Sequence, residues 1–174
     1  MTETGTTSPD VAPIEVAPGI YRLGGVVPLD DRLSWVAAQQ LASWEPVSAY
    51  LVLDSGEALL VDTGVTVHRA LIFKQLRELL GTRRLSVALT RFEPDCLVNL
   101  SALRAAFPVD RVYGGGVSNP FDFFEDVFDE ANNEAQVRAG THVEMVRKRP
   151  GDSIVVGGRS LALLATSLRL LTTF

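Results

Sequence analysis

The chain has 174 residues, of which 47% are hydrophobic and 21% charged, so we expect one globular domain with a substantial core. Its net charge of −5 provides no basic surface of the kind that binds nucleic acid, so we expect no nucleic-acid partner. No run reaches 18 apolar residues, so we expect no membrane span. The single cysteine allows no internal disulfide and favours a reducing, cytoplasmic location.

The start of the chain differs in composition from the rest. The first 13 residues are rich in Thr, Ser and Pro, with no apolar segment after a basic start. We therefore expect a disordered tail over 1–13 and one domain over 14–174. Alternating residues over 20–23 indicate a short strand. The segment 26–46 has two interpretations, a short capped helix or a long packed loop.

The next segments predict a hairpin followed by a helix. Apolar strands over 48–54 and 57–62 flank Ser55 and Gly56, and we expect the glycine to supply the positive φ of the turn. Apolar residues recur at a helical period over 66–80. Gly81 then follows at the position where glycine commonly ends a helix.

A strand–helix–strand unit comes after this helix. We expect a strand over 85–90, a helix over 97–107 and a strand over 111–113. A further helix is predicted over 120–136, where aromatic residues share one face.

The last segments predict more strands. Those over 143–147 and 153–156 are expected to pair as a hairpin, and a further strand is expected over 161–165. Hairpin strands at both ends with strand–helix units between them predict an α+β mixed sheet with helices packed outside. The apolar run 168–174 ends the chain, and we expect missing sequence beyond it.

Asp62 follows an apolar strand and precedes Thr63 and Gly64. A carboxylate in this position has two interpretations. It either orients a neighbouring metal ligand or caps the turn through backbone hydrogen bonds.

A second group of polar residues follows the strand over 85–90. Glu93, Asp95 and Cys96 are donor types that suit iron, manganese or zinc. The alternative is that Asp95 caps the following helix and Cys96 is a small buried residue. Arg91 is a permanent cation that would oppose a metal, and we expect it to pair with Glu93 or Asp62.

The two histidines do not complete a metal-binding pattern. His68 is expected to be exposed or to start a helix, and His142 is expected on the surface. His68 has no histidine or carboxylate at i+2 or i+4, and the single carboxylate at i+2 from His142, Glu144, does not complete a metal-binding pattern.

The order of these elements resembles the N-terminal half of the metallo-β-lactamase fold. The resemblance rests on the strand 48–52, the L-L-V-D-T-G run over 59–64, a helix, and the T-R-F-E-P-D-C run over 90–96. In the segment that corresponds to residues 90–96, most members of that superfamily carry T-H-x-H-x-D-H. The flavodiiron, or oxygen-binding di-iron, branch uses H-x-E-x-D-H. Glu93 and Asp95 match that pattern, whereas Arg91 and Cys96 replace its two histidines.

This resemblance implies an incomplete αββα sandwich, namely its N-terminal half plus the following hairpin. The bridging acid and last histidine of the family would follow after Phe174. The resemblance implies metal ligands at Glu93, Asp95 and Cys96, with iron or zinc as the metal. Asp62 and Arg91 would lie beside these ligands, and no flavin is expected because the chain has no flavodoxin-like extension.

Three functional hypotheses follow. The first is a degenerate, truncated metallo-β-lactamase-fold protein with weak or no catalysis. The second is a metal-dependent hydrolase or di-iron oxidoreductase whose altered site is completed by a partner chain or by further sequence. The third is an interaction module that forms a homo-oligomer through an exposed sheet edge.

Overall fold

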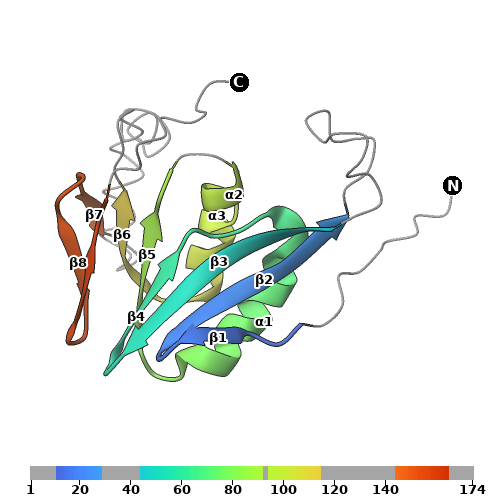
Figure 1. Ribbon diagram of the computed structural model, residues 1–174, viewed down its shortest axis with the longest axis horizontal. Helices are drawn as coiled ribbons and strands as arrows, with labels where there is room; N and C mark the ends of the chain where they lie inside the picture. Colours follow the sequence, from blue (N-terminus) through green and yellow to red (C-terminus); the bar gives the residue numbers. More distant parts are fainter. Residues whose placement is uncertain (1–10, 29–43, 92–93, 115–143, 165–174) are drawn as a thin grey trace, which may run out of the picture.

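The computed structural model describes residues 11–28, 44–91, 94–114 and 144–164 (Figure 1). The expected helix over 120–136, most of the segment 26–46, and the residues Glu93 and His142 lie outside this description.

The centre of the molecule is one seven-stranded sheet whose strands follow one another in chain order. The first four strands pair antiparallel, and the last four pair parallel, with β4 common to both parts. The mixed sheet expected from the sequence is therefore confirmed. The strands are β1 (Ile14–Ala17), β2 (Ile20–Pro28), β3 (Trp44–Asp54), β4 (Glu57–Val61), β5 (Arg84–Leu89), β6 (Val109–Gly114) and β7 (Glu144–Arg147).

The predicted hairpin is present as β3 and β4, which pair from Asp54↔Glu57 to Tyr50↔Val61. The residue that adopts a positive φ in its turn is Ser55, at 49°, and Gly56 does not. The expectation that the glycine supplies this conformation is therefore wrong. Serine accepts the strain of a left-handed φ because the paired strands on both sides determine the path of the turn.

Helices connect the parallel strands. A 3-10 turn, η2 (Thr66–His68), leads into α1 (Arg69–Leu80), which ends at Gly81 with a φ of 57° as the sequence indicates. The helix expected over 97–107 is instead divided into α2 (Pro94–Leu97) and α3 (Leu100–Ala106). The division falls at Asn99, whose side chain bonds backbone carbonyls of another loop.

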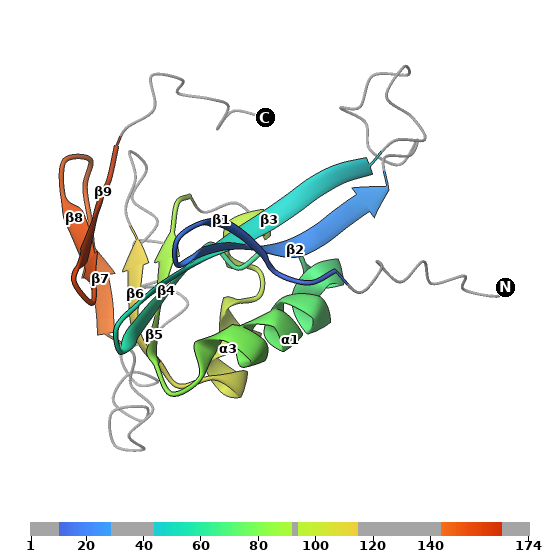
Figure 2. The same ribbon diagram turned by 60° about the horizontal axis from the view of Figure 1, so that its bottom comes forward.

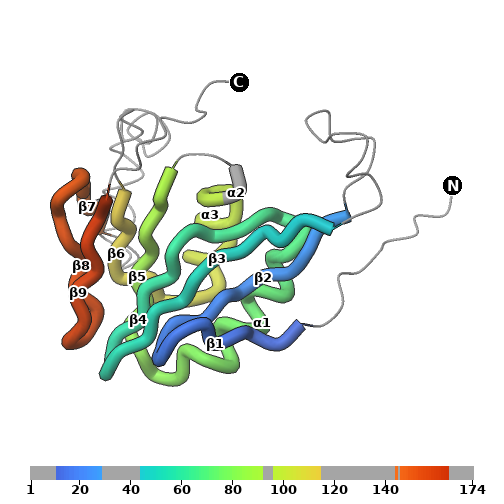
Figure 3. Tube along the Cα trace, in the orientation of Figure 1, coloured from blue at the N-terminus to red at the C-terminus, as the bar shows by residue number. Residues whose placement is uncertain are grey.

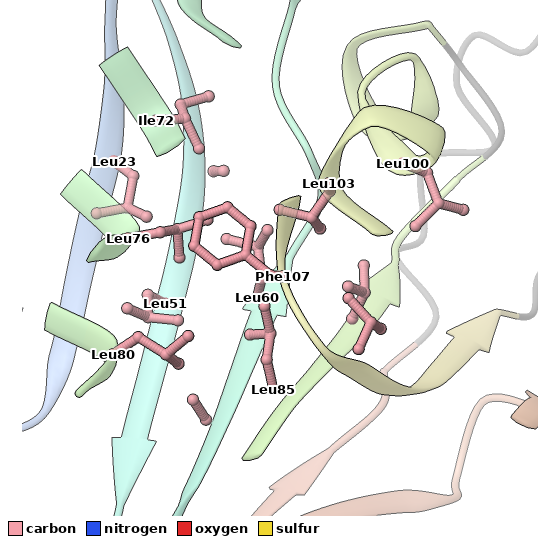
Figure 4. Packing of buried hydrophobic residues seen from close by; sticks show 14 of the residues in the cluster. Leu23, Leu51, Leu60, Ile72, Leu76, Leu80, Leu85, Leu100, Leu103 and Phe107 are labelled. Carbon is pink, nitrogen blue, oxygen red and sulfur yellow. The ribbon is translucent and has the colours of Figure 1, made fainter. Parts of the chain in front are cut away.

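The main core lies between the sheet and these helices (Figure 4). One face of α1 contributes Ile72, Leu76 and Leu80, which repeat at the spacing of an amphipathic helix. Phe73 meets Phe107 edge to face, with ring centroids 5.3 Å apart. Alternate residues of the central strands complete this core: Ala49, Leu51, Ala58, Leu60, Leu85, Val87 and Leu89.

Two buried polar side chains cover the edge of β2 that β1 leaves unpaired beyond Arg22. The Gln75 side chain accepts a hydrogen bond from the Gly24 N–H at 2.8 Å and donates to the Val11 carbonyl at 2.6 Å. The Nε2 atom of His68 lies 3.2 Å from the Val26 carbonyl. His68 is 0% exposed, so the expectation of an exposed histidine is wrong, although its place before α1 agrees with a helix start.

The opposite face of the sheet carries a separate two-stranded sheet, β8 (Ser153–Val156) and β9 (Arg159–Ala162). The hairpin predicted between 143–147 and 153–156 is wrong, because β7 pairs parallel with β6, and β8 pairs with β9. Ile154 and Val156 pack onto Val52, Leu59 and Ala88 as a second apolar cluster. These sheet residues alternate with those that face the helices, so the hairpin begins a layer on the other side (Figure 2).

No helix among the described residues is long and apolar enough to cross a membrane.

Candidate functional site at the strand ends

The carboxyl ends of β4 and β5 bring together the residues that the sequence singles out after each strand. Asp62 follows β4 directly and has a φ of 61°, a left-handed conformation that non-glycine residues seldom adopt. Its backbone N–H donates to the Ala88 carbonyl at 2.8 Å, so the chain leaves the sheet at a defined angle. A strained aspartate held in this way directs its carboxylate towards the end of β5.

Both oxygens of that carboxylate accept hydrogen bonds from Thr90. The Thr90 N–H donates to Oδ1 at 2.8 Å, and the Thr90 hydroxyl donates to Oδ2 at 2.7 Å. Hydrogen bonds to an ionised acceptor are the stronger kind. Asp62 therefore makes the backbone bond expected of a turn-capping carboxylate, and it ties together the loops that follow two neighbouring strands.

Cys96 lies beside the Asp62–Thr90 pair, on the side that faces the protein interior. It is 2% exposed, and its Sγ lies 3.7 Å from the Thr90 hydroxyl oxygen. Because that hydroxyl gives its single hydrogen to Asp62, its oxygen can only accept from the thiol. The buried Cys96 side chain therefore lies against the Thr90 hydroxyl, which is itself bound to the Asp62 carboxylate.

Asn99 is the polar residue of this region that sequence reasoning missed. It is 0% exposed, and its Nδ2 lies 3.0, 2.9 and 3.1 Å from the carbonyls of Thr63, Gly64 and Val65. Its Oδ1 accepts from Arg69 Nε at 2.8 Å. The available signal was a single amide within the apolar run over 97–100, since a buried amide there needs hydrogen-bond partners.

The two strand-end loops are joined at a second point by their backbones. The Thr63 N–H donates to the Cys96 carbonyl at 2.8 Å, and the Asn99 N–H lies 3.2 Å from the Thr63 hydroxyl, to which it donates. Thr63 is 1% exposed, so both bonds lie out of contact with water. These bonds attach the loop after β4 to the segment between α2 and α3.

The predicted metal ligands are only partly placed by the structure. Among the residues the structure describes, no group of three His, Cys, Asp or Glu side chains is placed to hold a metal ion. Among the described residues, Asp62 and Cys96 both lie against Thr90, the first through two hydrogen bonds and the second through its sulfur. Glu93 and the side chain of Asp95 lie outside the description, and Arg91 is exposed at the end of β5. The ligand set therefore stays a prediction.

A cleft of about 830 Å³ lies away from these strand ends. It follows the amino-terminal part of β5 and β6, with Arg84 and Asp110 among its lining residues, and it reaches the β8–β9 hairpin at Val155. Three arginines and three acids line it, so its charges offset one another: Arg84, Arg104, Arg111, Glu57, Asp110 and Glu144.

The sequence matches no protein-family model and no curated protein. Solved structures do match, and they define the class of fold. A metallo-β-lactamase of Cronobacter sakazakii, described by its HARLDQ motif, is 20% identical with a TM-score of 0.52. A metallo-β-lactamase of Pontibacter korlensis is 13% identical with a TM-score of 0.52. A fragment of diflavin flavoprotein A 5 of Nostoc sp. PCC 7120 is 13% identical with a TM-score of 0.61.

These matches cover 87, 85 and 85% of this chain, respectively. They cover only 53, 57 and 53% of the solved chains, so the protein spans about half their length. The fold is the metallo-β-lactamase fold, over the part that corresponds to its N-terminal half. The resemblance of the sequence to that fold is therefore confirmed. At these identities the likeness concerns the fold alone.

Proposed function

We propose that this protein is a degenerate metallo-β-lactamase-fold protein with weak or no catalysis. The observation that carries the proposal is the place of Cys96, which stands where the resembling family has a histidine ligand. Its side chain is buried, and its Sγ lies 3.7 Å from the Thr90 hydroxyl oxygen, which in turn donates to Asp62. A cysteine must lose its proton before it binds a metal, and burial in apolar surroundings opposes that loss.

Arg91 supports the same proposal at the other altered position. It occupies the place of the first histidine of the H-x-E-x-D-H pattern and lies exposed next to Thr90. A guanidinium carries its charge at every accessible pH and offers no lone pair to a metal. Loss of two of the ligands should weaken a metal centre far more than the roughly 10–100-fold of changes made around intact ligands.

The branch of the superfamily is part of the proposal. Glu93 and Asp95 keep the E-x-D spacing of the flavodiiron, or oxygen-binding di-iron, pattern. The likeness to the Nostoc diflavin flavoprotein supports this assignment, because that protein's name points to the same branch. We place the chain beside that branch as a relative that keeps the scaffold and has lost the two histidines.

A second candidate function is a metal-dependent hydrolase or di-iron oxidoreductase with an altered iron or zinc site. The Cronobacter protein favours it, because a chain described as a metallo-β-lactamase carries HARLDQ in place of H-x-H-x-D-H. A partner chain or further sequence would complete the site. The exposed apolar residues of the edge strand β1, Ile14 at 42% and Val16 at 52%, favour a second copy as that partner.

Native mass spectrometry with metal analysis on the same purified sample tests the proposal. We expect a metal-free mass after incubation with zinc or iron, and no hydrolysis of lactone, thioester or phosphodiester substrates. The double variant Arg91→His, Cys96→His, which restores both histidines of the H-x-E-x-D-H pattern, should gain metal. The exposed Arg149→His, which adds a histidine elsewhere, should not. One or two metal ions in the wild type, with turnover that disappears in Glu93→Ala, would overturn the proposal in favour of the second candidate.

A further inference from the structure

Three turns meet at the end of the molecule that lies opposite the strand-end site (Figure 3). The turn of the β8–β9 hairpin donates two backbone hydrogen bonds to the β3–β4 turn, from Gly157 N–H to Glu57 Oε2 and from Gly158 N–H to Asp54 Oδ2, both at 2.8 Å. Arg159 also donates to the Pro18 carbonyl in the β1–β2 turn at 2.9 Å. Asp54 and Glu57 of the β3–β4 hairpin thus bind the turn of the β8–β9 hairpin.

The approach of these two turns requires glycine. Gly157 has a φ of 60°, and a Cβ atom there would lie 2.7 Å from the Asp54 carbonyl oxygen. Successive backbone N–H groups in a tight turn form a concave site for anions, and here the anions are side chains of the same chain. The N–H groups of Gly157 and Gly158 therefore form a contact that suits negatively charged carboxylates.

Among the residues that the structure describes, the hairpin has few other attachments to the sheet. β8 and β9 form their own two-stranded sheet, so no strand pairing joins them to the seven-stranded sheet. Their apolar contact is the small cluster beneath Ile154 and Val156, while Val155 between them is 59% exposed. An element with a small buried area and its own hydrogen bonds can open without unfolding the rest.

We propose that the β8–β9 hairpin is a releasable layer, latched to the sheet by the carboxylates of Asp54 and Glu57 and freed when they are neutralised. Release would uncover the apolar face formed by Val52, Leu59 and Ala88. Other groups also face the latch: Arg84 on β5, 2.5 Å from Glu57; Arg111 on β6; Arg159 on the hairpin; the Ser55 hydroxyl; and Asp110, 4.0 Å from Arg84.

The charge state of Glu57 supports this latch. The backbone N–H of Gly157 is the main cause that lowers the pKa of Glu57 below its usual value of 4.5, and Arg84 and Arg111 act in the same direction. A carboxylate with a lowered pKa stabilises the folded arrangement above its unfolded pKa and loses that effect as the pH falls through the folded pKa. Release by acid is therefore expected below pH 4.5.

Hydrogen exchange on the full chain tests the latch. The double variant Asp54→Asn, Glu57→Gln imitates neutralised carboxylates with little change of shape. We expect the amides of β8 and β9 to exchange about tenfold faster in it, whereas those of β3, β4 and β5 keep their protection. The matched control Glu45→Gln, Glu78→Gln neutralises two exposed acids that make no contact with the latch and should leave the hairpin unchanged.

A second measurement uses the wild type alone. Protection factors, which are corrected for the pH dependence of intrinsic exchange, should stay constant for the hairpin from pH 6 to pH 4.5 and fall below pH 4.5, before they fall for the central strands. The proposal is overturned if hairpin protection is the same in the double variant and the wild type. Loss of protection in the hairpin and the central strands together would also overturn it, because the hairpin would then open only by global unfolding.

Discussion

Asn99 shows how one side chain can determine the shape of a strand-end loop. Its amide serves three successive carbonyls, and its oxygen is held by Arg69 from helix α1. The same loop holds Asp62 in its left-handed conformation, which a free loop would seldom adopt. The geometry of the predicted site therefore depends on a residue that lies outside the predicted ligand set.

Replacing Asn99 should destabilise the protein substantially. Asn99→Ala leaves buried carbonyls without a donor, so we expect the free energy of unfolding in urea to fall by about 2–4 kcal/mol. Ser101→Ala, at an exposed position on α3, is the control and should change it by less than about 0.5 kcal/mol. Equal stability of the two variants would mean that water replaces the amide in the loop.

At the scale of elements, hydrogen-bonding side chains replace strands where the sheet is incomplete. β1 covers only the first part of β2, and beyond it helix α1 supplies Gln75, and the preceding turn η2 supplies His68, to the free edge. An unpaired edge would otherwise leave backbone groups unsatisfied and open to other chains. This explains why Gln75 is fully buried on a helix that otherwise presents apolar residues to the sheet, and why His68 is buried just before it.

Gln75→Leu tests this role of the helix. The leucine keeps the volume and apolar character but leaves the Gly24 N–H and the Val11 carbonyl without partners, so we expect a loss of about 1–3 kcal/mol in unfolding free energy. Glu78→Ala, on the exposed side of α1, serves as the comparison and should have little effect. A leucine variant as stable as the wild type would contradict the assignment.

The turn of the β8–β9 hairpin is tested by Gly157→Ala. A Cβ atom would press on the Asp54 backbone at a positive φ, and we expect a loss of about 1–3 kcal/mol in thermal or urea unfolding. Gly56→Ala introduces a methyl group where no atom lies within 4 Å, so it should change stability by less than about 1 kcal/mol. Similar effects of both substitutions would show that the close approach of the two turns does not contribute to stability.

At the scale of the whole molecule, the described residues cover the two faces of the sheet unequally, because α1 and α3 pack along the centre of one face and the β8–β9 hairpin packs on part of the other. The β8–β9 hairpin covers the area around Val52 and Leu59, but on the same face Tyr50 is 42% exposed. The solved structures of this fold are about twice as long as this chain. We therefore expect acid to weaken the contact between this face and the β8–β9 hairpin before it unfolds the rest of the sheet.

The stability of the whole chain should depend on Glu57 in a pH-dependent manner. Because its folded pKa is lowered, the stabilisation that Glu57 contributes is present above pH 4.5 and disappears as the pH falls through the folded pKa. Urea unfolding of wild type and Glu57→Gln should therefore differ at pH 7 and converge near pH 3. A difference that stays constant with pH would assign the effect to shape and not to charge.

The sequence by itself determined the mixed sheet, the β3–β4 hairpin, helix α1 with its end at Gly81, and the position of Asp62 after a strand. These features are local, because hydrophobic period and turn residues act between near neighbours. The resemblance carried by residues 59–64 and 90–96 also led to the correct fold.

Only the tertiary structure decided which strands pair across the last part of the chain. The apolar strand 153–156 could equally have paired with β7. It pairs with β9 because Ile154 and Val156 can then be buried on the second face of the sheet. Tertiary packing also decided the burial of His68, Gln75 and Asn99. Their partners lie 42, 51 and 36 residues away in the chain, beyond the range of any local pattern.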